Sequence, residues 1–223
     1  MSNESITSVL KEARRFTPSD EFSSAARVKS REEYERLYRE SLDAPDAFWR
    51  RESADLVFRE PWNALSREKG SEGPAKFPFV EWFTGAKLNV TESCLDRHMT
   101  GWRKNKAAIL WEGELGKTRT VTYAELYRET IRLANALAGL GVKKGDRVAI
   151  YMGMVPEVAV AMLACARLGA VHTVIFGGFA AEAIAQRIAD SQAKIVITQD
   201  GGYRRGNVLA LKEVVDRAVA QPE

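Results

Sequence analysis

The chain has 223 residues, of which 45% are hydrophobic and 28% are charged, so it is long enough to bury a sizeable core. Its formal net charge of +3, from 33 basic and 30 acidic residues, is too balanced for the one-sided basic surface of a nucleic-acid-binding protein. The two cysteines form no CxxC or Cys/His cluster and no apolar run reaches membrane-spanning length, which argues against a zinc site, a disulfide framework or a membrane partner and favours a reduced, cytoplasmic setting.

Residues 1–105 are predicted to form an irregular, mainly helical N-terminal wrapping region. Ser30 and Glu33 have the spacing of a capping box, which predicts a helix from residue 31 onward. Other helices are expected over residues 6–16, 45–56 and 92–101. The composition of residues 63–78 is typical of a loop. Amphipathic helices bury their apolar face on another body, so this region is expected to cover the rest of the chain.

Residues 106–223 follow a different pattern, which predicts an α/β subdomain. The segments AAILWEG and TRTVTY indicate a β-hairpin, and Thr122 with Glu125 indicates a second capping box opening a long helix. Apolar strands are then expected at 147–152, 171–176 and 194–198, alternating with helices. This alternation predicts a partial, mostly parallel sheet with helices on both faces and right-handed crossovers.

Two phosphate-binding motifs fit the sequence poorly. Gly116-Lys117-Thr118 resembles the end of a Walker A loop, but Trp111 stands where its first glycine is required and a β-rich run follows instead of a helix. A plain hairpin turn is favoured there. After the strand at 147–152 only Gly153 is present, so a dinucleotide-binding GxGxxG loop is not supported.

Two further loops leave the ends of predicted strands, where open α/β sheets bind ligands. Gly177 and Gly178 follow one strand, and glycines permit close approach of a ligand, although a tight strand-to-helix turn would also use them. Arg204 and Arg205 stand among the glycines of DGGYRRGN, before a helix expected to begin near residue 207. This loop would suit a phosphate monoester. The alternative is that the two arginines are a solvated surface pair that binds no ligand.

Several segments together resemble one protein family. They include FTGAKLNVTESCLDRH, WEGE, GVKKGDRVAIYM, PEVAVAMLACARLGAVHTVIFGGF, AEAIAQRIADSQAKIVIT and DGGYRRG. In this order they resemble the N-terminal part of the acetyl-CoA synthetases, which belong to the AMP-forming, adenylate-forming acyl-CoA synthetases. The resemblance implies that the α/β region is the first part of the large domain of such an enzyme.

The resemblance also implies an activity and a site. The family joins acetate and ATP, with Mg²⁺, into acetyl-AMP and then transfers the acetyl group to the thiol of CoA. The residues that match its contacts to the 3′-phosphorylated ADP end of CoA are Arg204, Arg205, Gly206 and Asn207. Asn207 departs from the family, which often has a second basic residue there, so Arg205 is expected to compensate. Gly177 and Gly178 match the segment that lines the pantetheine path.

The sequence contains no Ser/Thr/Gly-rich phosphate loop ending in Gly-Lys and no match to the family's catalytic lysine. It is therefore interpreted as an N-terminal fragment that lacks catalysis alone and whose unfinished sheet favours self-association. Two alternatives stay open. One is a self-standing nucleotide-binding module, and the other is an interaction protein such as a truncated paralogue that pairs with a full synthetase.

Overall fold

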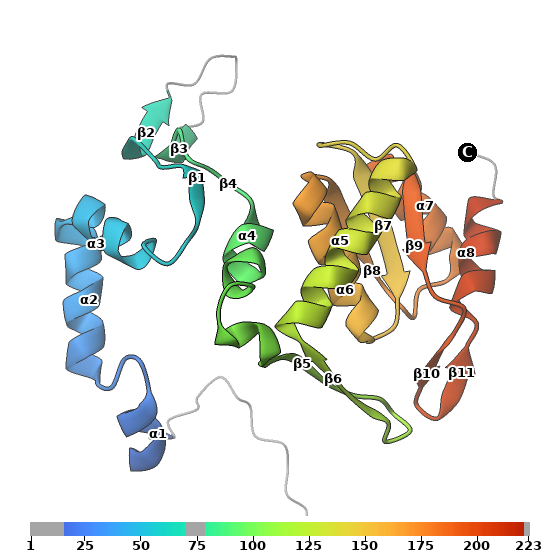
Figure 1. Cartoon of the computed structure of the whole chain (residues 1–223), viewed down its shortest axis with the longest axis horizontal. Helices are drawn as coiled ribbons and strands as arrows, with labels where there is room; N and C mark the ends of the chain where they lie inside the picture. The colour runs from blue at the N-terminus through green and yellow to red at the C-terminus, as the bar shows by residue number, and fades with distance from the viewer. Residues whose placement is uncertain (1–15, 70–78, 221–223) are drawn as a thin grey trace, which may run out of the picture. The chain divides into compact units, whose positions relative to one another are not determined.

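The computed structural model describes residues 16–69 and 79–220 (Figure 1). The chain divides into two compact units, Met1–Ser53 and Ala54–Glu223. The boundary predicted near residue 105 stays a prediction. The helix predicted over residues 6–16 lies outside the described residues except for its last position.

The described part of the first unit, residues 16–53, contains three helices, α1 (Asp20–Ala25), α2 (Arg31–Asp43) and α3 (Pro45–Glu52). The predicted cap of α2 is confirmed, because the Ser30 hydroxyl accepts a hydrogen bond from the Glu33 amide at 3.2 Å. The Glu33 carboxylate accepts a hydrogen bond from the Lys29 amide at 2.9 Å. In a full capping box this bond would come from the amide of the cap residue, Ser30. No residue of the three helices is buried.

The second unit begins with antiparallel strand pairs that the sequence did not predict. They are β1 (Phe58–Glu60) with β4 (Lys87–Leu88), and β2 (Ala64–Lys69) with β3 (Phe79–Thr84). The loop predicted over 63–78 is therefore wrong for its first part, and residues 70–78 lie outside the described residues. The polar composition misled because pairing with β3 and burial of Leu65 stabilise this strand, and neither is visible in local sequence.

A hairpin and a long helix follow as predicted. After the short helices α4 (Val90–Cys94), η2 (Asp96–His98) and η3 (Trp102–Asn105), β5 (Ala107–Glu112) pairs with β6 (Thr118–Thr122). The helix α5 (Tyr123–Gly139) opens with a full capping box. Thr122 N donates to the Glu125 carboxylate at 2.7 Å and Glu125 N donates to the Thr122 hydroxyl at 3.2 Å. The bonds that the Thr122 amide and the Thr122 hydroxyl donate to the Glu125 carboxylate lower the pKa of Glu125.

The predicted parallel sheet is confirmed, with strand order β8-β7-β9. Its strands are β7 (Arg147–Met152), β8 (Val171–Phe176) and β9 (Ile195–Thr198). Its helices, in addition to α5, are α6 (Pro156–Leu168), α7 (Ala181–Ser191) and α8 (Leu211–Val219). Figure 1 shows α5 and α6 covering one face and α7 and α8 the other. Val148 packs in the apolar cluster beneath α5 and α6, whereas Ala149 and Tyr151 pack in the cluster beneath α7 and α8, as the two-residue period of a strand requires.

The segment after β9 differs from the prediction. It forms a second hairpin, β10 (Gly202–Arg204) with β11 (Asn207–Leu209), and α8 begins only at Leu211. The expected helix start near residue 207 is therefore wrong. Arg205 and Gly206, the two loop residues, have φ of 52° and 75°, as in the type I′ turns that suit the twist of a hairpin. Arg205-Gly206 therefore stands where such turns often have Asn-Gly, with arginine in place of asparagine.

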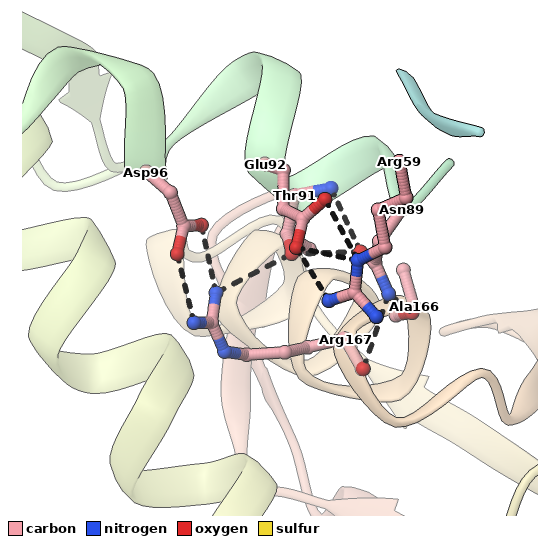
Figure 2. Close-up of polar contacts among 7 residues, drawn as sticks. All are labelled: Arg59, Asn89, Thr91, Glu92, Asp96, Ala166 and Arg167. Carbon is pink, nitrogen blue, oxygen red and sulfur yellow. Dashed lines mark hydrogen bonds and ion pairs between the residues drawn. The ribbon is translucent and has the colours of Figure 1, made fainter. Parts of the chain in front are cut away.

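A polar network joins α4 and η2 to the end of α6 (Figure 2). The Asn89 side chain caps α4 by accepting from Thr91 N at 3.0 Å. Its amide group also donates to the carbonyl oxygens of Ala166 and Arg167, at 3.0 and 3.2 Å. One side chain thus satisfies the start of one helix and the end of another, where backbone groups lack partners within the helix.

Two ion pairs surround this junction. Arg167 binds Asp96 through two hydrogen bonds of 2.8 Å, and both side chains are 27% exposed. Arg59 Nε donates to both oxygens of Glu92 at 2.9 and 3.1 Å, and this contact lowers the pKa of Glu92. The Arg167–Asp96 pair is the better shielded of the two, and a planar two-bond geometry is the strong form of such contacts.

Replacing Arg167 by methionine should lower the free energy of unfolding by about 1–3 kcal/mol, because Asp96 would be left half-buried without its partner. Denaturant unfolding of this variant, of Asp96→Asn and of the double variant would give the coupling energy. The control is Arg132→Met, which breaks an exposed pair with Glu129 and should cost less than about 0.5 kcal/mol. Purely additive effects of the two single changes would contradict the prediction.

Candidate functional site

The carboxyl ends of the three parallel strands bring the predicted loops to one edge of the sheet (Figure 1). Gln199, directly after β9, ties this edge together. Its side chain accepts from Gly153 N, after β7, at 3.0 Å, and donates to the Gly201 carbonyl at 2.6 Å. The base of the β10–β11 hairpin is thereby fixed to the end of the central strand.

Arg204 and Gly178, two of the predicted site residues, lie next to each other. The Arg204 guanidinium stacks on the ring of Phe176, with its central carbon 4.7 Å from the ring centroid. A Cβ atom placed on Gly178 would stand only 2.1 Å from Nη1 of Arg204, so the missing side chain leaves room for the guanidinium. Gly177 is also in a close position, since its Cβ would stand 3.1 Å from the Met152 carbonyl oxygen.

The Arg204 guanidinium has no carboxylate partner within ion-pair distance among residues 16–69 and 79–220. Its charge acts on the nearby hydroxyl of Tyr151. Burial raises the pKa of Tyr151, and Arg204 opposes this shift. The Tyr151 hydroxyl donates to the carbonyl of Phe179 at 3.1 Å, which holds the turn after β8. Arg204 is therefore a positioned cation whose charge is not neutralised within the described chain.

A second guanidinium–ring pair lies beside that of Arg204 and Phe176. Phe176 and Phe179 meet edge to face with centroids 5.9 Å apart, and the guanidinium of Arg187 lies 4.4 Å from the centroid of Phe179. Phe176 and Phe179 are 59% and 37% exposed. Sequence reasoning passed over these three residues, although the aromatic residues on both sides of the glycine pair in FGGF were a usable signal. Two cations on two aromatic rings suit a ligand that carries both an anion and a flat ring.

The other predicted residues form the tip of the β10–β11 hairpin. The amides of Arg205 and Gly206 donate to the two carboxylate oxygens of Glu114, at 2.9 and 3.2 Å. Asn207 Nδ2 donates to the carbonyl oxygen of Arg205 at 3.2 Å and so closes the turn. The two amide donors of this turn are thus bound by Glu114, a residue that sequence reasoning missed. The Arg205 side chain is exposed.

The side chains gathered at this sheet edge, guanidinium groups and aromatic rings, are of kinds that bind an anion or a flat ring. Burial and two neighbouring arginines hold the pKa of His98 below its usual value, and its ring packs on Tyr123 with centroids 5.0 Å apart. Within residues 16–69 and 79–220, no group of three or more His, Cys, Asp or Glu side chains is placed to hold a metal ion. The described helices include none that is both long and apolar enough to cross a membrane.

Comparison with known proteins agrees with the sequence resemblance. The family described as acetyl-coenzyme A synthetase N-terminus matches residues 34–94. The acetyl-coenzyme A synthetase of Chlorobaculum tepidum is 49% identical over 98% of this chain, and that of Deinococcus radiodurans is 48% identical over 97%. The chain spans about a third of these relatives, 32% of each.

A solved structure supports the fold. Acetoacetyl-CoA synthetase from Streptomyces lividans matches with a TM-score of 0.73 and 32% identity, over 83% of this chain and 28% of that protein. The family described as AMP-binding enzyme matches residues 95–222. This range includes the parallel sheet, the loop at Gly177 and Gly178, and the β10–β11 hairpin, called the Arg204 hairpin below. The chain therefore belongs to the family of AMP-binding enzymes.

Proposed function

We propose that this chain is the CoA-side portion of an AMP-forming acetate–CoA ligase and binds the 3′-phosphate of CoA. The observation that carries the proposal is the unneutralised guanidinium of Arg204, held on Phe176 beside Gly178. A guanidinium fixed in one plane is a good donor for a phosphate group. The similarity to acetyl-coenzyme A synthetases supports CoA as the source of that phosphate.

The site's other residues fit parts of the same ligand. Arg205, exposed at the hairpin tip, is positioned to supply the second cation that the family has at the place of Asn207. The exposed side chains of Phe176 and Phe179 provide apolar surface for adenine, and Gly177 and Gly178 match the segment that lines the pantetheine path in the family. The thiol of CoA would then attack acetyl-AMP and release AMP.

ATP and Mg²⁺ belong to the adenylation half of this proposed reaction. The described residues do not fit a magnesium site, since they hold no acidic cluster with metal-ligand geometry, and no residue here is assigned to the ion. Cys94 and Cys165 are free thiols whose pKa values are raised by burial, which suits a reducing cytoplasmic setting and unreactive structural roles.

Arg204→Ala in a full-length synthetase with this sequence should raise the KM for CoA about ten- to a hundred-fold, because a charge-assisted phosphate contact is lost. The KM values for ATP and acetate, and ATP–pyrophosphate exchange, should change little. Steady-state kinetics with CoA and with dephospho-CoA would measure the effect, since the variant should no longer discriminate between the two.

Two variants serve as controls for this test. Arg217→Ala removes an exposed arginine on α8 and should leave the KM for CoA unchanged. Gly178→Ala keeps the charge of Arg204 but places a methyl group where its guanidinium lies, so it should reproduce a weaker form of the defect. Equal damage to adenylation and thioester formation by Arg204→Ala would show that the residue is structural.

The 223-residue chain alone should form neither acyl-adenylate nor acyl-CoA. Nucleotidyl transfer depends on positioning and on stabilising charge at phosphorus, and the sequence has no match to the phosphate loop or lysine that supply them in the family. A pyrophosphate-release assay with acetate, ATP and Mg²⁺ tests this. Turnover above the blank would refute the fragment interpretation.

The same chain should self-associate through its parallel sheet. β8 is an edge strand, and Val171, Val174 and Phe176 on it are 56%, 50% and 59% exposed. Unpaired strand edges with apolar side chains favour pairing with another chain. Light scattering across a concentration series should show association that Val174→Lys reduces. A strictly monomeric wild-type chain with a cooperative melt would favour the self-standing module instead.

A further inference from the structure

The turn of the β5–β6 hairpin is joined to the tip of the β10–β11 hairpin by the side chain of Glu114. Glu114 lies 91 residues before Arg205 in sequence, and its two oxygens accept from two consecutive amides. Two adjacent amides in a turn with positive φ form a concave anion-binding site. In this protein the chain's own carboxylate occupies that site.

The hairpin that carries Glu114 is itself anchored. Trp111 Nε1 donates to the carbonyl of Met154 at 2.7 Å, and Arg119 forms an ion pair with Glu157 at the start of α6. Both contacts attach the hairpin to the segment that follows the central strand β7. The β5–β6 hairpin is thus attached to Met154 and to the start of α6, and Glu114 connects it to the β10–β11 hairpin, which carries Arg204.

We propose that Glu114 is a positioning residue for the anion site, holding the Arg205–Gly206 turn so that a phosphate is bound by arginine side chains and not by the backbone. The inference rests on the proposed CoA site. The carboxylate fills both turn amides, which leaves the guanidinium groups of Arg204 and Arg205 as the donors for a phosphate. It also fixes the positive-φ conformation of Arg205, which a non-glycine residue adopts rarely.

Hydrogen exchange of the Arg205 and Gly206 amides in the 223-residue chain tests the contact directly. Glu114→Ala should accelerate exchange at both amides by at least about tenfold, since it removes both acceptors. Glu114→Gln retains one acceptor oxygen and should have an intermediate effect. The matched control is Glu112→Gln, an exposed glutamate on β5 that makes no bond to the hairpin tip, and it should change nothing. Unchanged exchange in Glu114→Ala would overturn the inference.

Binding of CoA and dephospho-CoA to the same variants, measured by calorimetry, tests the consequence. The wild-type chain should prefer CoA, and Glu114→Ala should lose about tenfold in affinity for CoA with little change for dephospho-CoA. Tighter CoA binding by Glu114→Ala would overturn the inference, because it would mean that the carboxylate competes with the phosphate.

The two proposals fail in different ways. Equal affinity of the wild-type chain for CoA and dephospho-CoA would overturn the CoA site and the role of Glu114 together. A wild-type preference for CoA that survives unchanged in Glu114→Ala would overturn the positioning role alone.

Discussion

The central strand β7 must be covered on both faces, and the arrangement of the second unit follows from that requirement. Val148, Ala149 and Ile150 are fully buried, and Tyr151 is nearly so. A strand with apolar side chains on both faces needs a helical layer on each side, which α5 with α6 and α7 with α8 provide. Parallel neighbours linked by helices then end at one edge, and the glycine loop and the Arg204 hairpin both leave from it.

The position of the Arg204 hairpin at that edge depends on contacts between segments far apart in sequence. Gln199 fixes the base of the Arg204 hairpin to the end of β7, and Glu114 fixes its tip to the β5–β6 hairpin. A hairpin of two three-residue strands is marginal by itself. Bound at both ends, it holds Arg204 against Phe176 without help from a long element of secondary structure.

The sequence predicted the parts of this fold that local periodicity determines. The strands at 147–152 and 171–176 and the capping box of Thr122 with Glu125 were predicted correctly. The β2–β3 pair and the β10–β11 hairpin were missed, because cross-strand partners stabilise them. The predicted site residues were identified by resemblance, and the structure places Gly178 beside Arg204. Glu114 could not be found from spacing alone, since its partners lie 91 and 92 residues away.

Two arginines show how the chain separates structural charge from available charge. Arg167 is matched to Asp96 through two hydrogen bonds, so its charge is used within the fold and is unavailable to a ligand. Arg204 is held by a different means, since an aromatic ring orients a guanidinium without neutralising it. A carboxylate in the place of Phe176 would position Arg204 equally well but would compete with any phosphate. Orientation by Phe176 is therefore the arrangement that keeps a fixed cation free to bind an anion.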